Sequence, residues 1–122
     1  MNTLDLFKGE TVFKEFRTGE IIFKEGEPGD NMYVVMEGAV DIKVGEEKFI
    51  VAQPGDILGE MALIDSSARS ATAVARTNCK LIAIDEKRFI FLIQQTPFFA
   101  IYVMRVLVER LRIMNKIMAS IT

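Results

Sequence analysis

The sequence predicts a mainly β domain with flanking helices, in which short strands form a jelly-roll-like sandwich or barrel. Between residues 11 and 85, short alternating apolar runs are separated by turn residues, which is the pattern of consecutive antiparallel strands. After residue 85 helical periodicity replaces this pattern, and residues 98–121 contain neither Gly nor Pro. We therefore predict a single domain over residues 1–122, with an N-terminal helix in 1–10, a β-roll in 11–85 and closing helices in 86–122.

Strand signals fill the central part of the chain. The clearest is Val40–Val44, where apolar positions 40, 42 and 44 alternate with charged positions 41 and 43, as in a half-buried strand. Glycines separate most of the runs and mark the turns between them. The predicted strands are Val12–Phe16, Glu20–Lys24, Met32–Met36, Val40–Val44, Lys48–Ala52, Ala71–Arg76 and Leu81–Ile84.

Two tetrads carry the same turn signature, Glu27-Pro28-Gly29-Asp30 and Gln53-Pro54-Gly55-Asp56. Proline fixes φ at the first corner of a turn and glycine accepts a positive φ at the second, so both tetrads predict type II turns. The strands between them do not repeat. We interpret the tetrads as two corners of one roll rather than as tandem repeats.

Helices are expected at both ends of the chain. The first is a short helix within Asn2–Lys8, capped by Asn2 or Thr3. Asp85 is a candidate N-cap for a helix that runs to residue 94 or 95. Thr96 then ends this helix, and Pro97 occupies the first position of the next one, where its missing N–H costs nothing.

Apolar residues of the last helix step by three and four positions, which is the spacing of a heptad seam. Such a seam packs either on its own barrel or in parallel against a second copy. Further apolar residues widen this surface, so we favour a homodimer through residues 98–121. The seam is Met104, Leu107, Leu111, Met114, Met118 and Ile121, with Arg105, Glu109, Arg112 and Lys116 on the opposite side.

Composition narrows the classes of function. The chain has no histidine, so we expect no metal site, no cofactor and no enzymatic activity. A net charge of −2 provides no field for capturing nucleic acid. No apolar run reaches the roughly 18–20 residues of a membrane span, and no secretory signal is recognised. With the lone Cys79, these features favour the cytoplasm.

Residues 59–72 combine complementary binding chemistry. The Glu60 carboxylate can accept hydrogen bonds from sugar hydroxyls, and the Arg69 guanidinium can bind two phosphate oxygens. Short helical turns between them direct backbone N–H groups at an anion. Each residue also has a structural interpretation: Gly59 as a turn, Glu60 as an acid at a helix start and Arg69 as a surface charge. The composition of the segment leaves both interpretations open.

This segment resembles the phosphate-binding cassette of cyclic nucleotide-binding domains, which occur in catabolite activators, kinase regulatory subunits and cyclic-nucleotide-gated channels. The resemblance lies in Gly59-Glu60-Met61-Ala62-Leu63-Ile64 and Arg69-Ser70-Ala71-Thr72, with the turns Phe23–Gly26, Gly29-Asp30, Met36–Gly38 and Pro54–Asp56. It covers nearly the whole chain in order. It implies an eight-stranded jelly-roll β-barrel plus an N-terminal helix and two C-terminal helices, with the cassette at 59–72.

The resemblance also implies a role for each cassette residue. Glu60 would bind the ribose 2′-hydroxyl, and Gly59 would let the backbone approach the sugar. Arg69 would pair with the exocyclic phosphate oxygens. The Ser70 hydroxyl and nearby N–H groups would complete the anion site, so the full set is Gly59, Glu60, Met61, Ala62, Arg69, Ser70 and Ala71.

Recognition of the base is expected from the barrel and the last helix. Candidates are Val51 and Ile57 on the barrel, and Arg110, Arg112 and Asn115 on the helix. Ser70 stands where cyclic-GMP binders of the family often carry Thr, so cyclic AMP is the expected ligand and cyclic GMP the alternative. Leu58 departs from the Phe that often precedes the cassette glycine in kinase subunits.

The implied function is a regulatory sensor that couples cyclic nucleotide binding to movement of its C-terminal helix. The alternative is a degenerate roll that serves only protein interaction or dimerisation. A small barrel enzyme is disfavoured by the missing ligands and bases. Direct binding to DNA would require a further domain, because the residues present offer no basic surface for it.

Overall fold

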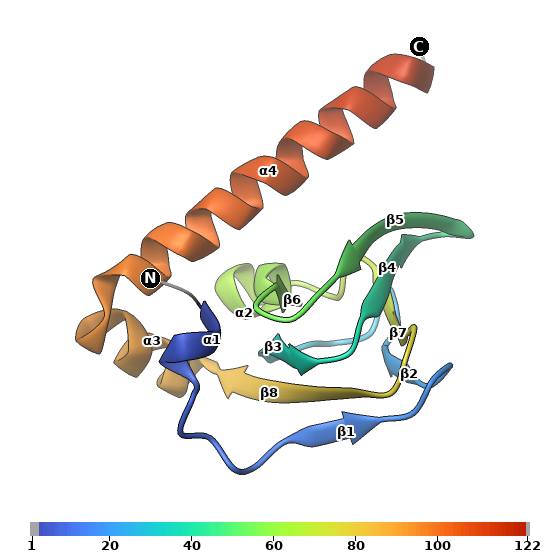
Figure 1. The fold of residues 1–122 in the computed structure, drawn as a ribbon. Helices are drawn as coiled ribbons and strands as arrows, with labels where there is room; N and C mark the ends of the chain where they lie inside the picture. The colour runs from blue at the N-terminus through green and yellow to red at the C-terminus, as the bar shows by residue number, and fades with distance from the viewer. Residues whose placement is uncertain (1–2, 122) are drawn as a thin grey trace.

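The computed structural model describes residues 3–121, apart from the side chains of Lys48, Phe49 and Ile121, and shows a β-roll with helices at both ends (Figure 1). Its described strands form two four-stranded antiparallel sheets, in the orders β1-β8-β3-β6 and β2-β7-β4-β5. The predicted fold class is therefore confirmed. The elements are α1 Thr3–Leu6, β1 Lys14–Phe16, β2 Ile21–Phe23, β3 Asn31–Glu37, β4 Val40–Val44, β5 Glu47–Ala52, β6 Ile57–Leu58, α2 Glu60–Asp65, β7 Thr72–Ala75, β8 Cys79–Asp85, α3 Glu86–Gln95 and α4 Pro97–Ile121.

The strands follow the sequence pattern closely. Val40–Val44 is found residue for residue as β4, and the six other predicted strands each overlap an observed one. The strand that the pattern missed is β6, because Ile57–Leu58 is too short to show any alternation. It pairs with β3 and leads directly into the helix α2.

Two apolar clusters share the strand β3. Tyr33 and Val35 belong to the cluster inside the roll, whereas Met32 and Val34 belong to the cluster under the helices. Both faces of β3 are therefore buried, which explains its continuous apolar run. The cluster under the helices includes Phe99 of α4, so the roll and its closing helices share one core.

The closing helices begin where the sequence predicts. The Asp85 carboxylate accepts a hydrogen bond of 2.8 Å from the backbone N–H of Arg88, so Asp85 is the N-cap of α3. Thr96 follows α3 as its C-cap, and Pro97 opens α4. The helix α1 is shorter than predicted, and the suggested cap Asn2 lies outside the described residues.

The residues of the predicted heptad seam of α4 do not share one environment. Leu107 packs against the core under the helices and Met114 lines a pocket, whereas Met104 and Leu111 are 52% and 60% exposed. The side toward the roll is instead formed by Phe99, Val103, Val106, Leu107 and Arg110. The C-terminal half of α4 extends beyond the sheets (Figure 1).

The two Pro-Gly tetrads adopt different conformations. Gly55 has a φ of 95°, and the N–H of Asp56 bonds the carbonyl of Gln53 at 2.8 Å, as a type II turn requires. Gly29 is not among the described glycines with positive φ, so the predicted type II turn there is wrong. The carbonyl of Glu27 accepts from the N–H of Arg69 instead.

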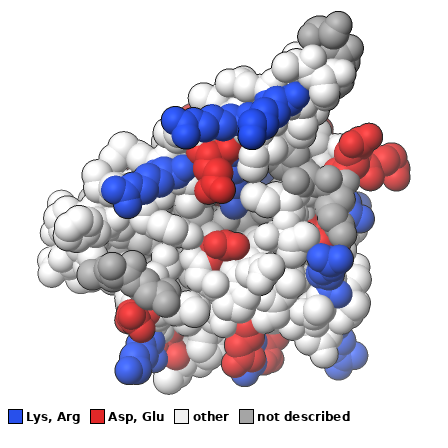
Figure 2. Space-filling model, turned by 45° about the horizontal axis from the view of Figure 1, so that its top comes forward, with Lys and Arg blue, Asp and Glu red and all other residues white. Residues whose placement is uncertain are grey.

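Charged side chains are mixed on the visible face. Figure 2 shows basic side chains interleaved with acidic ones along α4, while much of the remaining face is uncharged. Within residues 3–121, no group of three or more His, Cys, Asp or Glu residues is arranged as a metal site. No single helix of that range is long and apolar enough to span a membrane. The bent pair of α3 and α4 meets the criteria of length and hydropathy only when the two helices are taken together.

Candidate ligand-binding site

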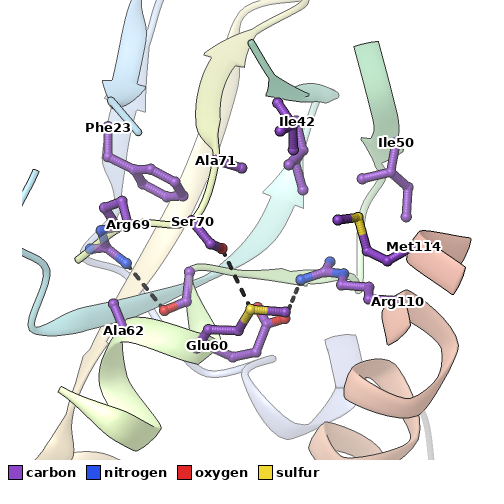
Figure 3. Close-up of a pocket in the computed structure, with 13 residues that line it drawn as sticks. Phe23, Ile42, Ile50, Glu60, Ala62, Arg69, Ser70, Ala71, Arg110 and Met114 are labelled. Atoms are coloured by element: carbon purple, nitrogen blue, oxygen red, sulfur yellow. Dashed lines mark hydrogen bonds and ion pairs between the residues drawn. The ribbon is translucent and has the colours of Figure 1, made fainter. Parts of the chain in front are cut away.

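A pocket of about 140 Å³ lies between the roll, α2 and α4 (Figure 3). It brings together all seven cassette residues that the sequence nominated, although their roles in binding stay predictions. The rest of the lining comes from β2, β4, β5 and α4. The lining residues are Phe23, Ile42, Val44, Ile50, Gly59, Glu60, Met61, Ala62, Arg69, Ser70, Ala71, Arg110 and Met114.

Gly59 connects β6 to the short helix α2. It is the N-cap of α2 and has a φ of 77°, a left-handed conformation that favours glycine. A Cβ at this position would lie 2.5 Å from the Nη1 atom of Arg69. Gly59 is therefore required both by the turn and by the arginine beside it.

Glu60 is buried, with only 1% of its surface exposed. Its Oε1 atom accepts a hydrogen bond from Arg110 of α4, and Arg110 also donates to the carbonyl of Ile57. Burial of a carboxylate is costly without a charged partner, so Arg110 compensates the charge of Glu60. The Oε2 atom has no hydrogen-bond partner within the described residues and remains an acceptor for a ligand hydroxyl.

Arg69 is the second charged group of the pocket and is 6% exposed. Its Nη1 atom donates hydrogen bonds of 2.7 and 3.1 Å to the carbonyls of Asn31 and Gly59. Its Cζ atom lies 4.3 Å from the centroid of the Phe23 ring, which is a cation–π contact. Burial lowers the pKa of its guanidinium. This effect is larger than the opposite effect of Tyr33 and nearby carboxylates, which raise that pKa. No hydrogen-bonded carboxylate within residues 3–121 neutralises Arg69, so this cation can receive an anion.

The Ser70 hydroxyl points across the pocket toward α2. It donates to the sulfur of Met61 at 3.4 Å, as the dashed line in Figure 3 marks. A thioether is a weak acceptor. The hydroxyl therefore has more to gain from a charged oxygen than it loses by leaving Met61.

The other end of the pocket is apolar. Ile42 of β4 and Ile50 of β5 lie side by side there with Met114 of α4 next to them (Figure 3), and Val44 of β4 also lines the pocket. The sequence reasoning did not nominate these three strand residues. The alternation of β4 could have revealed two of them, because positions 42 and 44 lie on one face of that strand.

Of the residues nominated for the base, Arg110 alone lines this pocket. Val51 follows Ile50 in β5, so its side chain lies on the opposite face of the strand. Ile57 is fully buried in the core under the helices and contributes its carbonyl to Arg110. Arg112 and Asn115 are exposed and do not line the pocket, since α4 turns them away from it.

Arg110 and Tyr102 attach α4 to the turn that precedes the cassette. The Tyr102 hydroxyl donates to the carbonyl of Gly55 at 2.8 Å, and Arg110 bonds the carbonyl of Ile57 two residues further along. Burial raises the pKa of Tyr102, so this phenol stays a donor at neutral pH. The helix and the pocket are thus joined by polar contacts as well as by apolar packing.

Within one small pocket of the β-roll, a buried acid can accept hydrogen bonds from hydroxyl groups and a buried arginine can bind an anion. The family model described as cyclic nucleotide-binding domain matches residues 13–96. The chain therefore belongs to the cyclic nucleotide-binding domain family.

Similar proteins include regulators of two kinds. A CRP-like cAMP-activated global transcriptional regulator of Mycobacterium tuberculosis is 30% identical over 112 residues, which cover 88% of this chain and 50% of the relative. A cAMP-dependent protein kinase regulatory subunit of Eremothecium gossypii is 41% identical over 71 residues, which cover 58% of this chain and 16% of the relative. The chain thus spans half the length of the first relative and much less of the second.

Solved structures have the same fold. A structure of PKAR CBD2 bound to Sp-2Cl-cAMPS superimposes with a TM-score of 0.78 and 26% identity, covering 93% of this chain and 84% of that one. The similarity therefore extends over most of this chain.

Proposed function

We propose that this chain is a sensor that binds a cyclic nucleotide, with cyclic AMP preferred over cyclic GMP, and that it transmits binding through α4. The observation that carries the proposal is that Glu60 and Arg69 are both buried and line one pocket. Two similar proteins, a cAMP-activated regulator and a cAMP-dependent kinase subunit, support this choice of ligand. As both are regulators, we propose that the chain itself catalyses no reaction.

In the proposed complex, Arg69 binds the exocyclic phosphate oxygens and the Oε2 atom of Glu60 accepts from the ribose 2′-hydroxyl. The Ser70 hydroxyl turns from the sulfur of Met61 to the phosphate. The backbone N–H groups of Met61, Ala62, Ser70 and Ala71 complete the anion site.

The purine then lies on the apolar wall of Ile42, Val44 and Ile50 under Met114. Adenine carries fewer polar groups than guanine at its six-membered ring. It therefore leaves fewer unpaired donors and acceptors against an apolar wall. This difference favours cyclic AMP.

Coupling to α4 follows from the contact between Glu60 and Arg110. A ribose hydroxyl that bonds Glu60 changes the surroundings of the carboxylate that attaches this helix to the cassette. Binding shifts the position of α4 only to the extent that the ligand prefers one arrangement of this contact.

The test is thermal unfolding with cyclic AMP, cyclic GMP, 5′-AMP and adenosine. A ligand that binds the folded state raises the melting temperature. We expect the largest shift with cyclic AMP, a smaller one with cyclic GMP and the smallest with adenosine, which lacks the phosphate. No shift with either cyclic nucleotide would overturn the proposal and favour a roll that serves only protein contacts.

We also propose that the sensor is a parallel homodimer through α4. Five apolar residues of its outer face are 40–60% exposed and step by heptad spacing, with Asn115 completing the series. β-Branched residues that alternate with Leu or Met, together with a single Asn, are typical of parallel two-stranded coiled coils. The seam is Ile101, Met104, Val108, Leu111, Asn115 and Met118.

The flanking charges favour the parallel arrangement. Arg105 and Arg112 lie beside this seam, and an antiparallel pair would place them opposite one another. We expect light scattering to show a dimer for the natural chain and a monomer for Leu111→Glu. Lys116→Glu, on the flank of the seam, is the matched control and should remain dimeric. A natural chain that is monomeric at high micromolar concentration would contradict the arrangement.

A further inference from the structure

The loop that carries Gly29 runs alongside the end of the cassette. The carbonyl of Glu27 accepts from the N–H of Arg69, and the N–H of Gly26 donates to the carbonyl of Arg69, both at 2.8 Å. Pro28 and Ala68 form a β-bridge next to these bonds. The loop therefore holds the backbone of the phosphate-binding arginine as a short antiparallel pair.

Gly29 touches the side chain of the same arginine. A Cβ built on Gly29 would lie 2.3 Å from Nε, 2.5 Å from Cζ and 2.8 Å from Cδ of Arg69. Non-bonded atoms at these distances would overlap. Any side chain at position 29 would therefore displace the guanidinium or the loop. The backbone of Gly29 itself has no positive φ, so the turn alone does not require glycine there.

Gly29 is not part of the ligand pocket. It lines a second surface hollow with Asp30, Ala62 and Leu63, and of these residues only Ala62 also lines the ligand pocket. The pocket residue nearest to a side chain at position 29 is Arg69, so we expect Arg69 to carry any influence of that side chain on a ligand.

The guanidinium is confined by other neighbours as well. Gly59 lies against the Nη1 atom of Arg69, and the centroid of the Phe23 ring lies 4.3 Å from its Cζ atom. Nη1 donates hydrogen bonds to two carbonyls, whereas Nε has no hydrogen-bond partner within residues 3–121. Two glycines and one ring thus fix the orientation in which the remaining donors of Arg69 are presented.

We propose that Gly29 is a positioning residue for phosphate recognition, because its missing side chain is the space that the Arg69 guanidinium occupies. This inference rests on the proposed function, in which Arg69 binds the phosphate of a cyclic nucleotide. It explains the glycine of the Pro28-Gly29 pair by the space that Arg69 needs rather than by the turn.

The experiment compares Gly29→Ala with Gly9→Ala. Gly9 has no positive φ and a Cβ there would meet nothing within 4 Å, so it is a matched control. By calorimetry with cyclic AMP, we expect Gly29→Ala to weaken affinity by about tenfold or more, approaching the loss caused by Arg69→Ala. The Gly9→Ala protein should bind like the natural chain.

A double-mutant cycle separates positioning from a general effect on the fold. In an Arg69→Ala background the three atoms nearest to a Cβ at position 29 are gone. Gly29→Ala should then leave the affinity for cyclic AMP unchanged, and it should shift the midpoint of urea unfolding no more than Gly9→Ala does. A loss of equal size in both backgrounds would overturn the inference, because Gly29 would then act on the fold without Arg69.

The two proposals fail in different ways. If the natural chain binds neither cyclic AMP nor cyclic GMP, the proposed function fails and the inference fails with it. If the natural chain binds and Gly29→Ala binds equally well, the inference alone is wrong.

Discussion

Arg69 and Arg110 are both buried arginines of the same pocket, yet their partners differ in charge. Arg110 bonds the Glu60 carboxylate and the carbonyl of Ile57. Arg69 bonds the carbonyls of Asn31 and Gly59, which carry no formal charge. Their exposed fractions, 6% and 9%, do not distinguish them.

The comparison teaches that the partners, and not burial or residue type, distinguish the two arginines, and we propose that the one without an acidic partner is the anion receptor. The charge of Arg110 is balanced by an acid of the protein, so its loss damages the protein. The charge of Arg69 is balanced by no hydrogen-bonded acid within the described residues, so we expect its loss mainly to weaken ligand binding. Four predictions, ordered from the largest expected effect, can break or sharpen this distinction.

Arg110→Ala should have the largest effect on stability. It leaves the buried Glu60 carboxylate without its cation. Removing one partner of a buried ion pair lowers the free energy of unfolding by about 3–5 kcal/mol. Urea unfolding of the unliganded protein measures the loss. Arg69→Ala, which leaves only carbonyls behind, is the comparison and should cost less. If it destabilises the protein more than Arg110→Ala does, the distinction is wrong.

Arg69→Ala should have the largest effect on affinity. It removes charge-assisted hydrogen bonds to phosphate, each worth about 1.5–3 kcal/mol, so affinity for cyclic AMP should fall by about tenfold to several hundredfold. Calorimetric titration measures the change. Arg105→Ala, an exposed position outside the pocket, is the control and should leave affinity unchanged. Equal affinities for Arg69→Ala and the natural chain would refute the phosphate role.

Glu60→Gln should have a smaller effect on affinity. The amide keeps the shape of the side chain but replaces a charged acceptor with a neutral one, which lowers affinity for cyclic AMP by about fivefold to tenfold. The loss should shrink for the 2′-deoxy form of cyclic AMP, because that ligand lacks the hydroxyl that Glu60 binds. If Glu60→Gln lowers the affinity for cyclic AMP and for its 2′-deoxy form by the same factor, Glu60 does not bind the 2′-hydroxyl.

The smallest expected effect is that of pH. Burial lowers the pKa of Arg69, but a guanidinium remains protonated far above neutral pH, and a bound phosphate favours the protonated form. The chain has no histidine to titrate in this range. Affinity for cyclic AMP should therefore stay constant between pH 6 and pH 8, and calorimetry at three pH values in that range would expose any steep change.

The cassette end of the pocket could be predicted from the sequence because its residues are local. Gly59, Glu60, Arg69 and their neighbours lie in one short segment, so their order along the chain nearly fixes their grouping. The roll was predictable for a similar reason, since strands such as Val40–Val44 show their alternation directly.

The apolar end could not be predicted in the same way, because it depends on which face each element turns inward. Val51 was nominated where Ile50 lines the pocket, and a shift of one residue in a strand exchanges its two faces. On α4, apolar residues occur around much of the helix, so their spacing did not show that Arg110 and Met114 face the roll. The role of Gly29 depends on a contact between distant segments, which no local pattern records.

The length of α4 beyond the pocket has a mechanical consequence. From Arg110 to Ile121 the helix is rigidly hydrogen-bonded and, at about 1.5 Å per residue, roughly 16 Å long. A tilt of about 10° about Arg110 would move its far end by roughly 3 Å. A rearrangement too small to disturb the packing around Glu60 would thus become a displacement the size of an atom at the far end of this lever.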